Sequence, residues 1–288
     1  MNPTYQIITD SCCDYPNEWY AQMDLTVVPL TVIYQGTARS DTNDDSLKQL
    51  YDGMRAGEAA STSAVNPQRW TMAMEPALKE GKDVLVMAFS SGLSTTYQSA
   101  VIAAEELREM YPDRKIYVVD TLSASLGQGL LVWYACQKRD AGMPLEEVYQ
   151  WVEDNKQHIC QWFTVEDLMH LKRGGRVSTT TALLGTMLQI KPVLHVDEEG
   201  HLINRAKSRG RKASIEALAN KVGELGEGYD NRTVAISHGD CLEEAQELAD
   251  MLKARYGVEN VLMSYVGAVI GSHAGPGTIA LFFMGKHR

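Results

Sequence analysis

A loop rich in hydroxyl groups, Ser90 to Thr95, is the first place where this sequence could do chemistry. Val84 to Phe89 is a continuous apolar run of strand length, and from Thr96 onward the apolar residues recur at helical spacing. This order points the unpaired N–H groups of the first helical turn past the end of the strand. An anion binds well there, but a simple helix cap uses the same atoms, so both interpretations stay open.

A second candidate is the segment Leu171-Lys172-Arg173-Gly174-Gly175-Arg176. Its paired glycines allow close backbone approach or a positive φ beside two guanidinium groups. Residues 172–212 hold nine Lys and Arg against three Asp and Glu, a net charge of +6. The whole chain has a formal charge of −10, so the rest carries −16. We interpret the basic span as a site for an anion or an acidic partner, in preference to a solvated face.

A third candidate is His273, which lies in the glycine-rich segment Gly267 to Gly277. We predict that this segment is a loop, because it contains four glycines and a proline. A histidine there has few side chains to pack against, which favours a functional role, since such loops often carry sites. His238, after another predicted strand, has weaker support.

Several chemistries have no motif in this sequence. It contains no GxxxxGK[ST] phosphate loop, GxGxxG turn, HExxH or GxSxG. The five cysteines are odd in number and irregularly spaced, which argues against a zinc site or a disulfide framework. A nucleophile and base pair of Ser94 and His273 is conceivable. Its orienting carboxylate could be any of three candidates, Asp10, Asp120 or Asp240, and the sequence does not choose between them.

Alternating strands and helices must position these residues. In the first half, buried strands separated by helices predict a mostly parallel, three-layer sheet, and polar residues that follow its strands form a ligand edge. The second half alternates again. We place the domain boundary near residue 163, giving an N-terminal α/β domain (1–163) and a C-terminal α/β domain (164–288). We expect strands at 5–9, 25–34 with a break or edge at Pro29, 84–89, 115–119, 233–236, 261–265 and 278–284, helices at 46–54, from 96, at 130–138, 144–158 and 242–256, and a polar loop at 59–67.

Composition excludes some classes of protein. The 288 residues, 44% hydrophobic and 22% charged, are typical of a globular chain with ample core. The net charge of −10 argues against general nucleic-acid binding. Because the sequence has no membrane-spanning apolar run and no signal-peptide pattern, we expect a cytoplasmic protein.

Taken in order, the motifs resemble those of the DegV family. The resemblance covers essentially the whole chain, and several of the motifs are long enough to be specific. The family includes the fatty-acid-binding subunits of the bacterial fatty acid kinase. The matching segments are Thr9-Asp10-Ser11, Thr62-Ser63, 90–100 without Thr95, Asp120 with the Ser-x-Gly-Gln-Gly of 125–129, 171–176, Lys191-Pro192 and the His-x-Gly-Pro-Gly of 273–277.

The resemblance implies a two-domain α/β protein that buries one long-chain fatty acid, with the carboxylate at the domain junction. A separate ATP-dependent kinase phosphorylates the bound acid to an acyl phosphate for phospholipid synthesis, so the chain itself is no enzyme and needs no cofactor. The head-group residues implied are Thr62, Ser94 and His273, with Arg176 as a supporting charge and Ser63, Thr95 and Gly275 beside them. The implied contacts to the kinase or to the new phosphate are Lys172, Arg173, Arg205, Lys207 and Arg209. We expect no membrane span, and transient membrane contact stays open.

The sequence departs from the family pattern at three places. Thr95 stands where Gly is usual, Ala64-Val65-Asn66-Pro67 replaces a common Gln-Pro-Ser, and Thr121 stands where Ser is common. A Cβ at residue 95 can narrow the head-group site or alter its loop. Chain preference and ligand identity therefore stay open, as do a Ser94/His273 hydrolase and a binding module for another small amphiphile.

Overall fold

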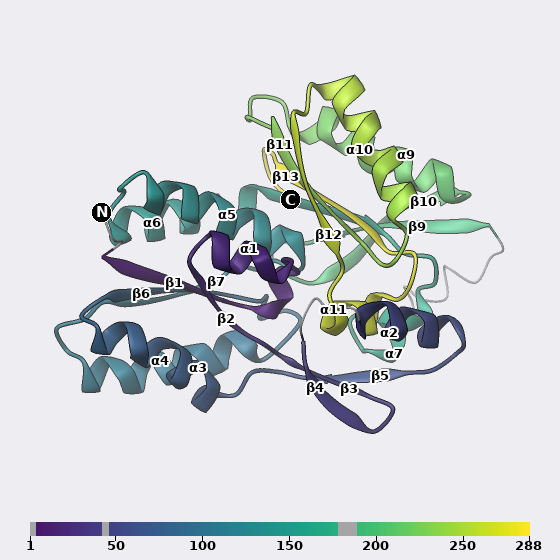
Figure 1. The fold of residues 1–288 in the computed structure, drawn as a ribbon. Coiled ribbons are helices and arrows are strands. Elements are labelled where there is room, and N and C mark those ends of the chain that lie inside the picture. Colours follow the sequence, from purple (N-terminus) through teal and green to yellow (C-terminus); the bar gives the residue numbers. More distant parts are fainter. Residues whose placement is uncertain (1–3, 42–45, 178–188) are drawn as a thin grey trace.

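The computed structural model describes residues 4–41, 46–177 and 189–288 (Figure 1). Its N-terminal part contains a parallel four-stranded sheet in the order β2-β1-β6-β7. Helices α3 and α4 cover one face and α5 and α6 the other, so the predicted three-layer arrangement is confirmed. The elements are β1 (Tyr5–Asp10), β2 (Leu25–Val28), β6 (Asp83–Ala88), β7 (Ile116–Asp120), α1 (Asn17–Gln22), α3 (Pro67–Lys79), α4 (Thr96–Met110), α5 (Leu126–Asp140) and α6 (Leu145–Asn155).

The predicted strand at 25–34 is two strands in different sheets. After β2 the chain turns at Pro29, where we expected a break, and continues as β3 (Thr31–Tyr34). A small antiparallel sheet follows, in the order β4-β3-β5. It contains β4 (Thr37–Ser40) and β5 (Ala60–Ser63), and helix α2 (Ser46–Arg55) lies between them in the chain.

The prediction of a polar loop at residues 59–67 is wrong for its first half. Residues 60–63 form strand β5, which pairs with β3 through Val32 opposite Thr62. The segment Ala-Ser-Thr-Ser has no apolar alternation, so its strand conformation comes from this pairing and not from a local pattern. The pairing fixes the position of Thr62, which becomes important at the site.

A second, six-stranded sheet occupies the C-terminal part, in the order β10-β9-β8-β13-β11-β12. All of its pairs are antiparallel except β11 with β12. Helices α9 (Arg211–Leu225) and α10 (Leu242–Tyr256) cover one face. The strands are β8 (Ile159–Thr164), β9 (Ile190–Val196), β10 (Leu202–Arg209), β11 (Thr233–His238), β12 (Asn260–Tyr265) and β13 (Ile279–Met284).

Helix α5 lies between the two large sheets. It packs against β6 of the first sheet and against β8, β11 and β13 of the second, and most of its side chains are buried. One hydrophobic core therefore runs through both halves. The predicted domain boundary at 163 falls within β8, a strand that pairs with β9 and β13 of the second sheet, so the chain enters that sheet at Ile159.

The glycine-rich segment that we predicted to be a loop is helical, since residues 268–274 form helix α11 (Ala268–Ala274). The helix predicted at 130–138 begins earlier than expected, and Gly127-Gln128-Gly129 lies in the first turn of α5. In α11, a Cβ on Gly271 would lie 2.5 Å from the hydroxyl oxygen of Tyr51, a fully buried residue of α2. This glycine is thus required for close helix packing and not for an unusual backbone conformation.

In the described part of the chain, no helix combines the length and apolarity needed to span a membrane.

Candidate ligand-binding site

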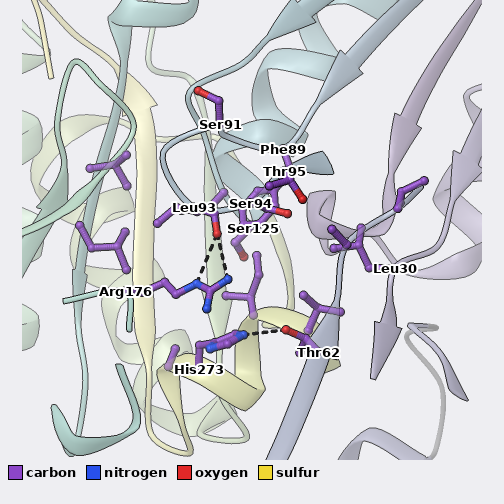
Figure 2. Close-up of a pocket in the computed structure, with 18 of the residues that line it drawn as sticks. Leu30, Thr62, Phe89, Ser91, Leu93, Ser94, Thr95, Ser125, Arg176 and His273 are labelled. Carbon is purple, nitrogen blue, oxygen red and sulfur yellow. Dashed lines mark hydrogen bonds between the residues drawn. The ribbon is translucent and has the colours of Figure 1, made fainter. Parts of the chain in front are cut away.

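A cavity of about 710 Å³ lies where the two halves of the molecule meet (Figure 2). It is lined by β5 and the loop after it, the loop after β6, helix α11, and the inward faces of β8 and β13. Its volume is in the range of about 300–1,000 Å³ that is usual for small-molecule sites.

Most of the cavity wall is apolar. Large side chains come from several elements distant in sequence, so that no single segment forms the cavity. They include Leu30, Phe89, Phe163, Leu202, Ile270 and Phe282. A wall of this kind suits a hydrocarbon chain, because apolar surface removed from water contributes about 25 cal/mol per Å².

Hydroxyl groups and an imidazole gather at one end. The Oγ1 of Thr62 lies 2.8 Å from the Nε2 of His273, which brings β5 and α11 together across 211 residues of sequence (Figure 2). Ser94 lines the same cavity from the loop after β6. Its Oγ accepts from the backbone N–H of Thr96, the first residue of helix α4, at 3.2 Å.

The guanidinium group of Arg176 lies at this polar end. It donates from Nε and Nη2 to the carbonyl oxygen of Leu93, at 3.3 and 3.0 Å, and from Nη1 to the carbonyl of Gly174. Among the described residues, no carboxylate forms an ion pair with it. A guanidinium has five N–H donors, and three are used here. A partly buried cation that pairs with no described carboxylate thus lies at the end of an apolar cavity.

His273 is neutral at physiological pH. Burial and the nearby charge of Arg176 lower its pKa to about 4. Its Nδ1 is buried against Gly174 and has no hydrogen-bond partner among the residues that the structure describes. Because a buried N–H without a partner is rarer than a buried acceptor without one, we assign the ring proton to Nε2. His273 then donates to Thr62, whose own hydroxyl proton is left for a ligand.

A single glycine permits this contact. A Cβ on Gly174 would lie 2.1 Å from the Nδ1 of His273. Gly174 has φ −72° and ψ −10°, an ordinary helical conformation, so its role is the close approach of the chain to the imidazole ring. Sequence analysis noted the paired glycines but gave no indication that His273 was the neighbour.

Most of the predicted head-group residues come together. Thr62, Ser63, Ser94, Thr95, Arg176 and His273 all line the cavity. Gly275 does not line it. This residue follows α11 with φ +85°, and a Cβ there would lie 2.5 Å from the ring of His170.

The five residues predicted to contact a kinase or a phosphate lie in different parts of the structure. Arg173, at the end of helix α7 (Met169–Arg173), lines a second cavity of about 380 Å³. Lys172 lines neither cavity. Arg205, Lys207 and Arg209 lie along strand β10, at the edge of the six-stranded sheet. Arg205 donates from Nε to the Nε2 of His195 at 2.8 Å.

Six further polar residues also line the cavity, and sequence analysis named none of them as a head-group residue: Asn66, Ser91, Ser99, Ser125, Gln161 and Thr278. Gln161 and Phe163 stand two residues apart on β8 and both face the cavity. Residues two apart on a strand point to the same face, so the spacing of Gln161 and Phe163 is the one sequence feature that indicates a cavity-facing Gln161. The apolar residues beside Gln161 make this feature hard to recognise.

The aspartates after the strands shape the loops instead of facing a ligand. Asp10 accepts from the N–H groups of Phe89 at 2.7 Å and Cys12 at 3.0 Å. Burial raises the pKa of Asp10 to about 7, although these two N–H groups favour its charged form. Asp120 accepts from the N–H of Ser91 at 3.1 Å and so holds the hydroxyl-rich loop.

The structure does not form a pair between Ser94 and His273. His273 hydrogen-bonds to Thr62, and the Oγ of Ser94 lies 2.8 Å from the Oγ1 of Thr96. The three aspartates considered as orienting groups have other partners; Asp240, for example, pairs with Arg55. The geometry is therefore that of a binding site for an anionic amphiphile.

Known proteins resemble the chain over its full length. The model of the DegV family, described as a family of uncharacterised proteins, matches residues 4–286. The chain belongs to the DegV family. A DegV domain-containing protein of Clostridium perfringens is 45% identical over 283 residues, 98% of this chain and 97% of that protein.

Two solved DegV structures have the same fold. One, from Thermus thermophilus, is described by its fatty acid binding; it has a TM-score of 0.85 at 32% identity and covers 98% of this chain and 99% of its own. The other, a DegV lipid-binding protein from Thermotoga maritima, has a TM-score of 0.85 at 31% identity and covers 99% of both chains.

Proposed function

We propose that this DegV protein binds one long-chain fatty acid in the cavity and presents its carboxylate to a separate ATP-dependent kinase. The observation that carries the proposal is Arg176, a cation without a carboxylate partner among the described residues, at the polar end of an apolar cavity. The solved DegV structures named for fatty acid and lipid binding support the same ligand class.

The acyl chain supplies most of the affinity. Each buried CH₂ contributes about 0.8 kcal/mol, so a chain of ~15 methylenes contributes about 12 kcal/mol. Association and ordering of the ligand cost roughly 4–15 kcal/mol. A long acyl chain therefore binds tightly only if its carboxylate is paired. Burial of an unpaired carboxylate costs more free energy than burial of the acyl chain contributes.

Three kinds of donor satisfy the carboxylate. Arg176 offers its two remaining N–H groups, Thr62 its hydroxyl proton, and Ser94 a second hydroxyl. Hydrogen bonds to a charged group contribute about 1.5–3 kcal/mol each. His273 acts through Thr62, since its Nε2–H occupies the threonine oxygen and directs the hydroxyl proton to the ligand.

A kinase supplies the phosphoryl group. One carboxylate oxygen forms a bond to the γ-phosphorus of ATP, the P–O bond to ADP breaks, and its electron pair leaves with ADP, so no proton is transferred. The exposed cations Lys207 and Arg209 of β10 are suited to dock an acidic face of that partner. If Lys207→Glu with Arg209→Glu left the rate of lipid phosphorylation by the kinase unchanged, docking at β10 would be wrong.

Organic extraction of the purified protein followed by mass spectrometry tests the lipid proposal. We expect one long-chain fatty acid in stoichiometric amount, and strong depletion in the Thr62→Ala/Ser94→Ala double variant. Thr37→Ala/Ser40→Ala is a matched control, because it removes two hydroxyls from the exposed strand β4 of the same small sheet. It should retain the lipid of the wild type.

A folded wild-type protein that yields no lipid and does not bind added palmitate would contradict the proposal. Recovery of a different amphiphile in stoichiometric amount would keep the cavity as a binding site but replace the ligand. Hydrolysis of a chromogenic ester that is lost in Ser94→Ala would instead favour a hydrolase.

A further inference from the structure

The loop after β7, residues 121–125, combines two unusual backbone conformations with a place in the wall of the cavity of about 710 Å³. Leu122 has φ +50°, and Ser125 has φ +54° with ψ −146°. Such angles are costly for residues other than glycine, and they persist only where the surrounding structure holds them. Ala124 and Ser125 line the cavity. The conformation of this loop therefore shapes the space for the ligand.

Arg288 holds this loop from the C-terminal part of the molecule. It follows β13 and is buried, with 6% of its surface exposed. Its Nη1 donates to the carbonyl oxygen of Leu122. Its Nη2 donates to the carbonyl oxygen of Thr121 and to the Oγ of Ser123, each at 3.1 Å. Three consecutive residues of the loop thus bind one guanidinium group.

The same guanidinium group also binds two segments that adjoin strands of the second sheet. Its Nη2 donates to the carbonyl oxygen of Lys156, shortly before β8, at 2.7 Å. Its Nη1 donates to the carbonyl oxygen of Asp197, directly after β9, at 3.2 Å. Both strands supply cavity wall, through Phe163 of β8 and Val196 of β9. Arg288 therefore ties the loop after β7 to two other parts of the wall.

Arg288 differs from Arg176 in where its donors go. Arg176 lines the cavity and keeps N–H groups for a ligand. Arg288 does not line the cavity, and its two terminal nitrogens already donate to five oxygen atoms of the protein. Arg288 is thus no ligand of a lipid, and any effect that it has on lipid binding must act through the segments that it holds.

We infer that Arg288 is a positioning residue for lipid binding, which holds the loop after β7 in its strained conformation against the acyl chain. The inference rests on the proposed function for its ligand. When the hydrogen bonds of the guanidinium group are lost, Leu122 and Ser125 relax towards negative φ, and the loop withdraws from the wall. The acyl chain then loses contacts, while the carboxylate keeps its donors.

Two substitutions of Arg288 and a matched control test this role. We expect Arg288→Met to lower palmitate affinity about tenfold, as if about two methylenes had lost contact with the wall. Arg288→Lys should lower it less, because an ammonium group still donates to some of the same oxygens. Arg139→Met is the control, since Arg139 is also buried and donates to the carbonyl oxygens of Met23 and Asp24, but lines neither cavity. It should lower the unfolding temperature and leave palmitate affinity within about twofold of wild type.

A further substitution tests whether Arg288 acts through the backbone of the loop. Glycine adopts a positive φ readily, so Leu122→Gly should restore part of the palmitate affinity that Arg288→Met loses. Hydrogen exchange of the lipid-free protein reports on the loop without a ligand. The N–H of Ala124 donates to the Oε1 of Gln161 at 3.2 Å, and it should exchange faster in Arg288→Met but not in Arg139→Met.

Equal losses of palmitate affinity in the Arg288 and Arg139 variants would overturn the inference, because they would show general loosening of the fold. Unchanged affinity in Arg288→Met, or no recovery with Leu122→Gly, would overturn it as well. If Arg288→Met does not fold, Arg288→Lys decides by the same measurements. If the folded wild type binds no palmitate, the proposed function fails and the role in lipid binding fails with it, whereas exchange at Ala124 separately shows whether Arg288 holds the loop.

Discussion

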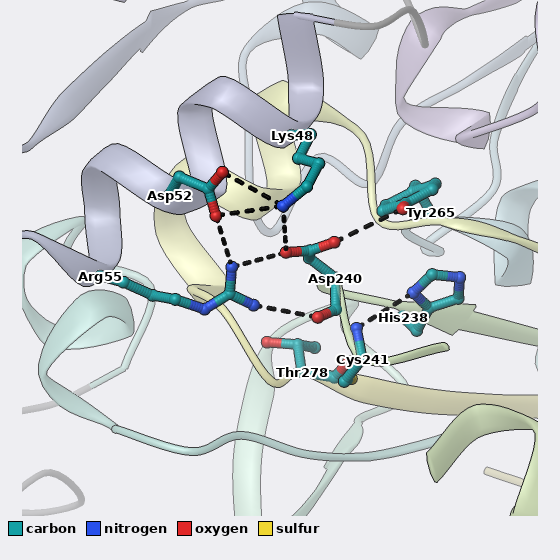
Figure 3. Close-up of polar contacts among 8 residues, drawn as sticks. All are labelled: Lys48, Asp52, Arg55, His238, Asp240, Cys241, Tyr265 and Thr278. Carbon is teal, nitrogen blue, oxygen red and sulfur yellow. Dashed lines mark hydrogen bonds and ion pairs between the residues drawn. The ribbon is translucent and has the colours of Figure 1, made fainter. Parts of the chain in front are cut away.

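Two clusters of charged and polar groups join the small sheet and α2 to the C-terminal part, and they differ in how their charges are neutralised. At the cavity, the hydrogen bonds of Arg176 within the described part of the chain go to backbone carbonyls (Figure 2). The second cluster, between α2 and the loop after β11, pairs its charges completely (Figure 3). There Arg55 and Lys48 lie 2.5 and 4.0 Å from Oδ2 of Asp240, and both also contact Asp52.

The difference separates a binding site from a structural contact. Two cations and two carboxylates in the Asp240 cluster need no further ion, and the hydroxyl of Tyr265 donates to the Oδ1 of Asp240 at 3.4 Å. The cation at the cavity has donors to spare and lies beside apolar walls. Burial of an unpaired charge is costly, so its persistence suggests a ligand that pairs with it. Substitutions in the two clusters should therefore separate affinity from stability.

The largest effect on affinity is expected from Arg176→Met. It removes two charge-assisted hydrogen bonds to the carboxylate, worth about 1.5–3 kcal/mol each, so palmitate affinity should fall at least a hundredfold. Stability should fall by only about 1 kcal/mol, because the lost carbonyl contacts are partly exposed to solvent. Calorimetric titration with palmitate and thermal unfolding of the lipid-free protein measure the two quantities.

Arg55→Met is the matched control for this substitution. It removes the same charge from the paired cluster, so we expect lower stability and palmitate affinity within about twofold of wild type. Equal losses of affinity in the two variants would contradict the distinction between the clusters, since the effect would then follow from general loosening of the junction.

The next largest effect on palmitate affinity is expected at Gly174, and the adjacent Gly175 provides a control. Gly174→Ala fits its backbone but places a Cβ 2.1 Å from Nδ1 of His273, so the ring must move away from Thr62. Gly175 has φ +72° and nothing within 4 Å of an added Cβ. We expect Gly174→Ala to lower palmitate affinity about tenfold or more, because Thr62 loses its donor and one hydrogen bond to a charge is weakened. Gly175→Ala should leave affinity unchanged and cost about 1–2 kcal/mol of stability. The same titration and unfolding measurements apply, and a reversed pattern would disprove the assigned roles.

Sequence analysis predicted the elements whose patterns are local. The apolar run that became β6, the amphipathic residues of α10 and the parallel three-layer arrangement follow from periodicity and chain order. The head-group residues were named from motifs, and the structure brings Thr62 and His273 within 2.8 Å of each other. Their roles as ligands of a carboxylate remain predictions.

What sequence analysis missed depends on tertiary contacts. Strand β5 pairs with β3, and helix α11 packs closely against Tyr51 of α2 at Gly271. In both segments glycine or serine suggested a loop, yet the deciding partner lies far away in the sequence. The second cavity could not be predicted for the same reason, since its walls come from β5, α7 and α11.

The pH dependence of stability should distinguish His273 from other groups. Its folded-state pKa of about 4 lies below the usual 6.5, so the unfolded chain binds more protons between these values. Stability contributed by neutral His273 is complete above pH 6.5 and is lost as the pH falls towards 4. His273→Asn should therefore reduce the slope of unfolding free energy against pH in this range, by up to about 1.4 kcal/mol per pH unit.

His195 provides the comparison for that experiment. Its pKa is also lowered to about 4, by burial and by Arg205, but it does not line the cavity. His195→Asn should likewise reduce the slope of the unfolding free energy, yet only His273→Asn should lower palmitate affinity. An unchanged slope in His273→Asn would show that its ring is not held neutral in the folded protein.

The smallest effect is expected from Asp240→Asn, which tests the paired cluster itself. Asp240 has φ +56°, a conformation that asparagine also tolerates, so the substitution removes charge without adding backbone strain. With Arg55 and Lys48 partly exposed, the loss should be about 0.5–1 kcal/mol in low salt and smaller in 1 M NaCl, where ion pairs are screened. Asp230→Asn is the control, because its pair with Arg232 lies on the surface within one turn and should contribute no measurable stability. Palmitate affinity should stay at the wild-type value in both variants. A fall in affinity with Asp240→Asn alone would mean that the paired cluster also holds the cavity in its binding geometry, and the two clusters would then act as one unit.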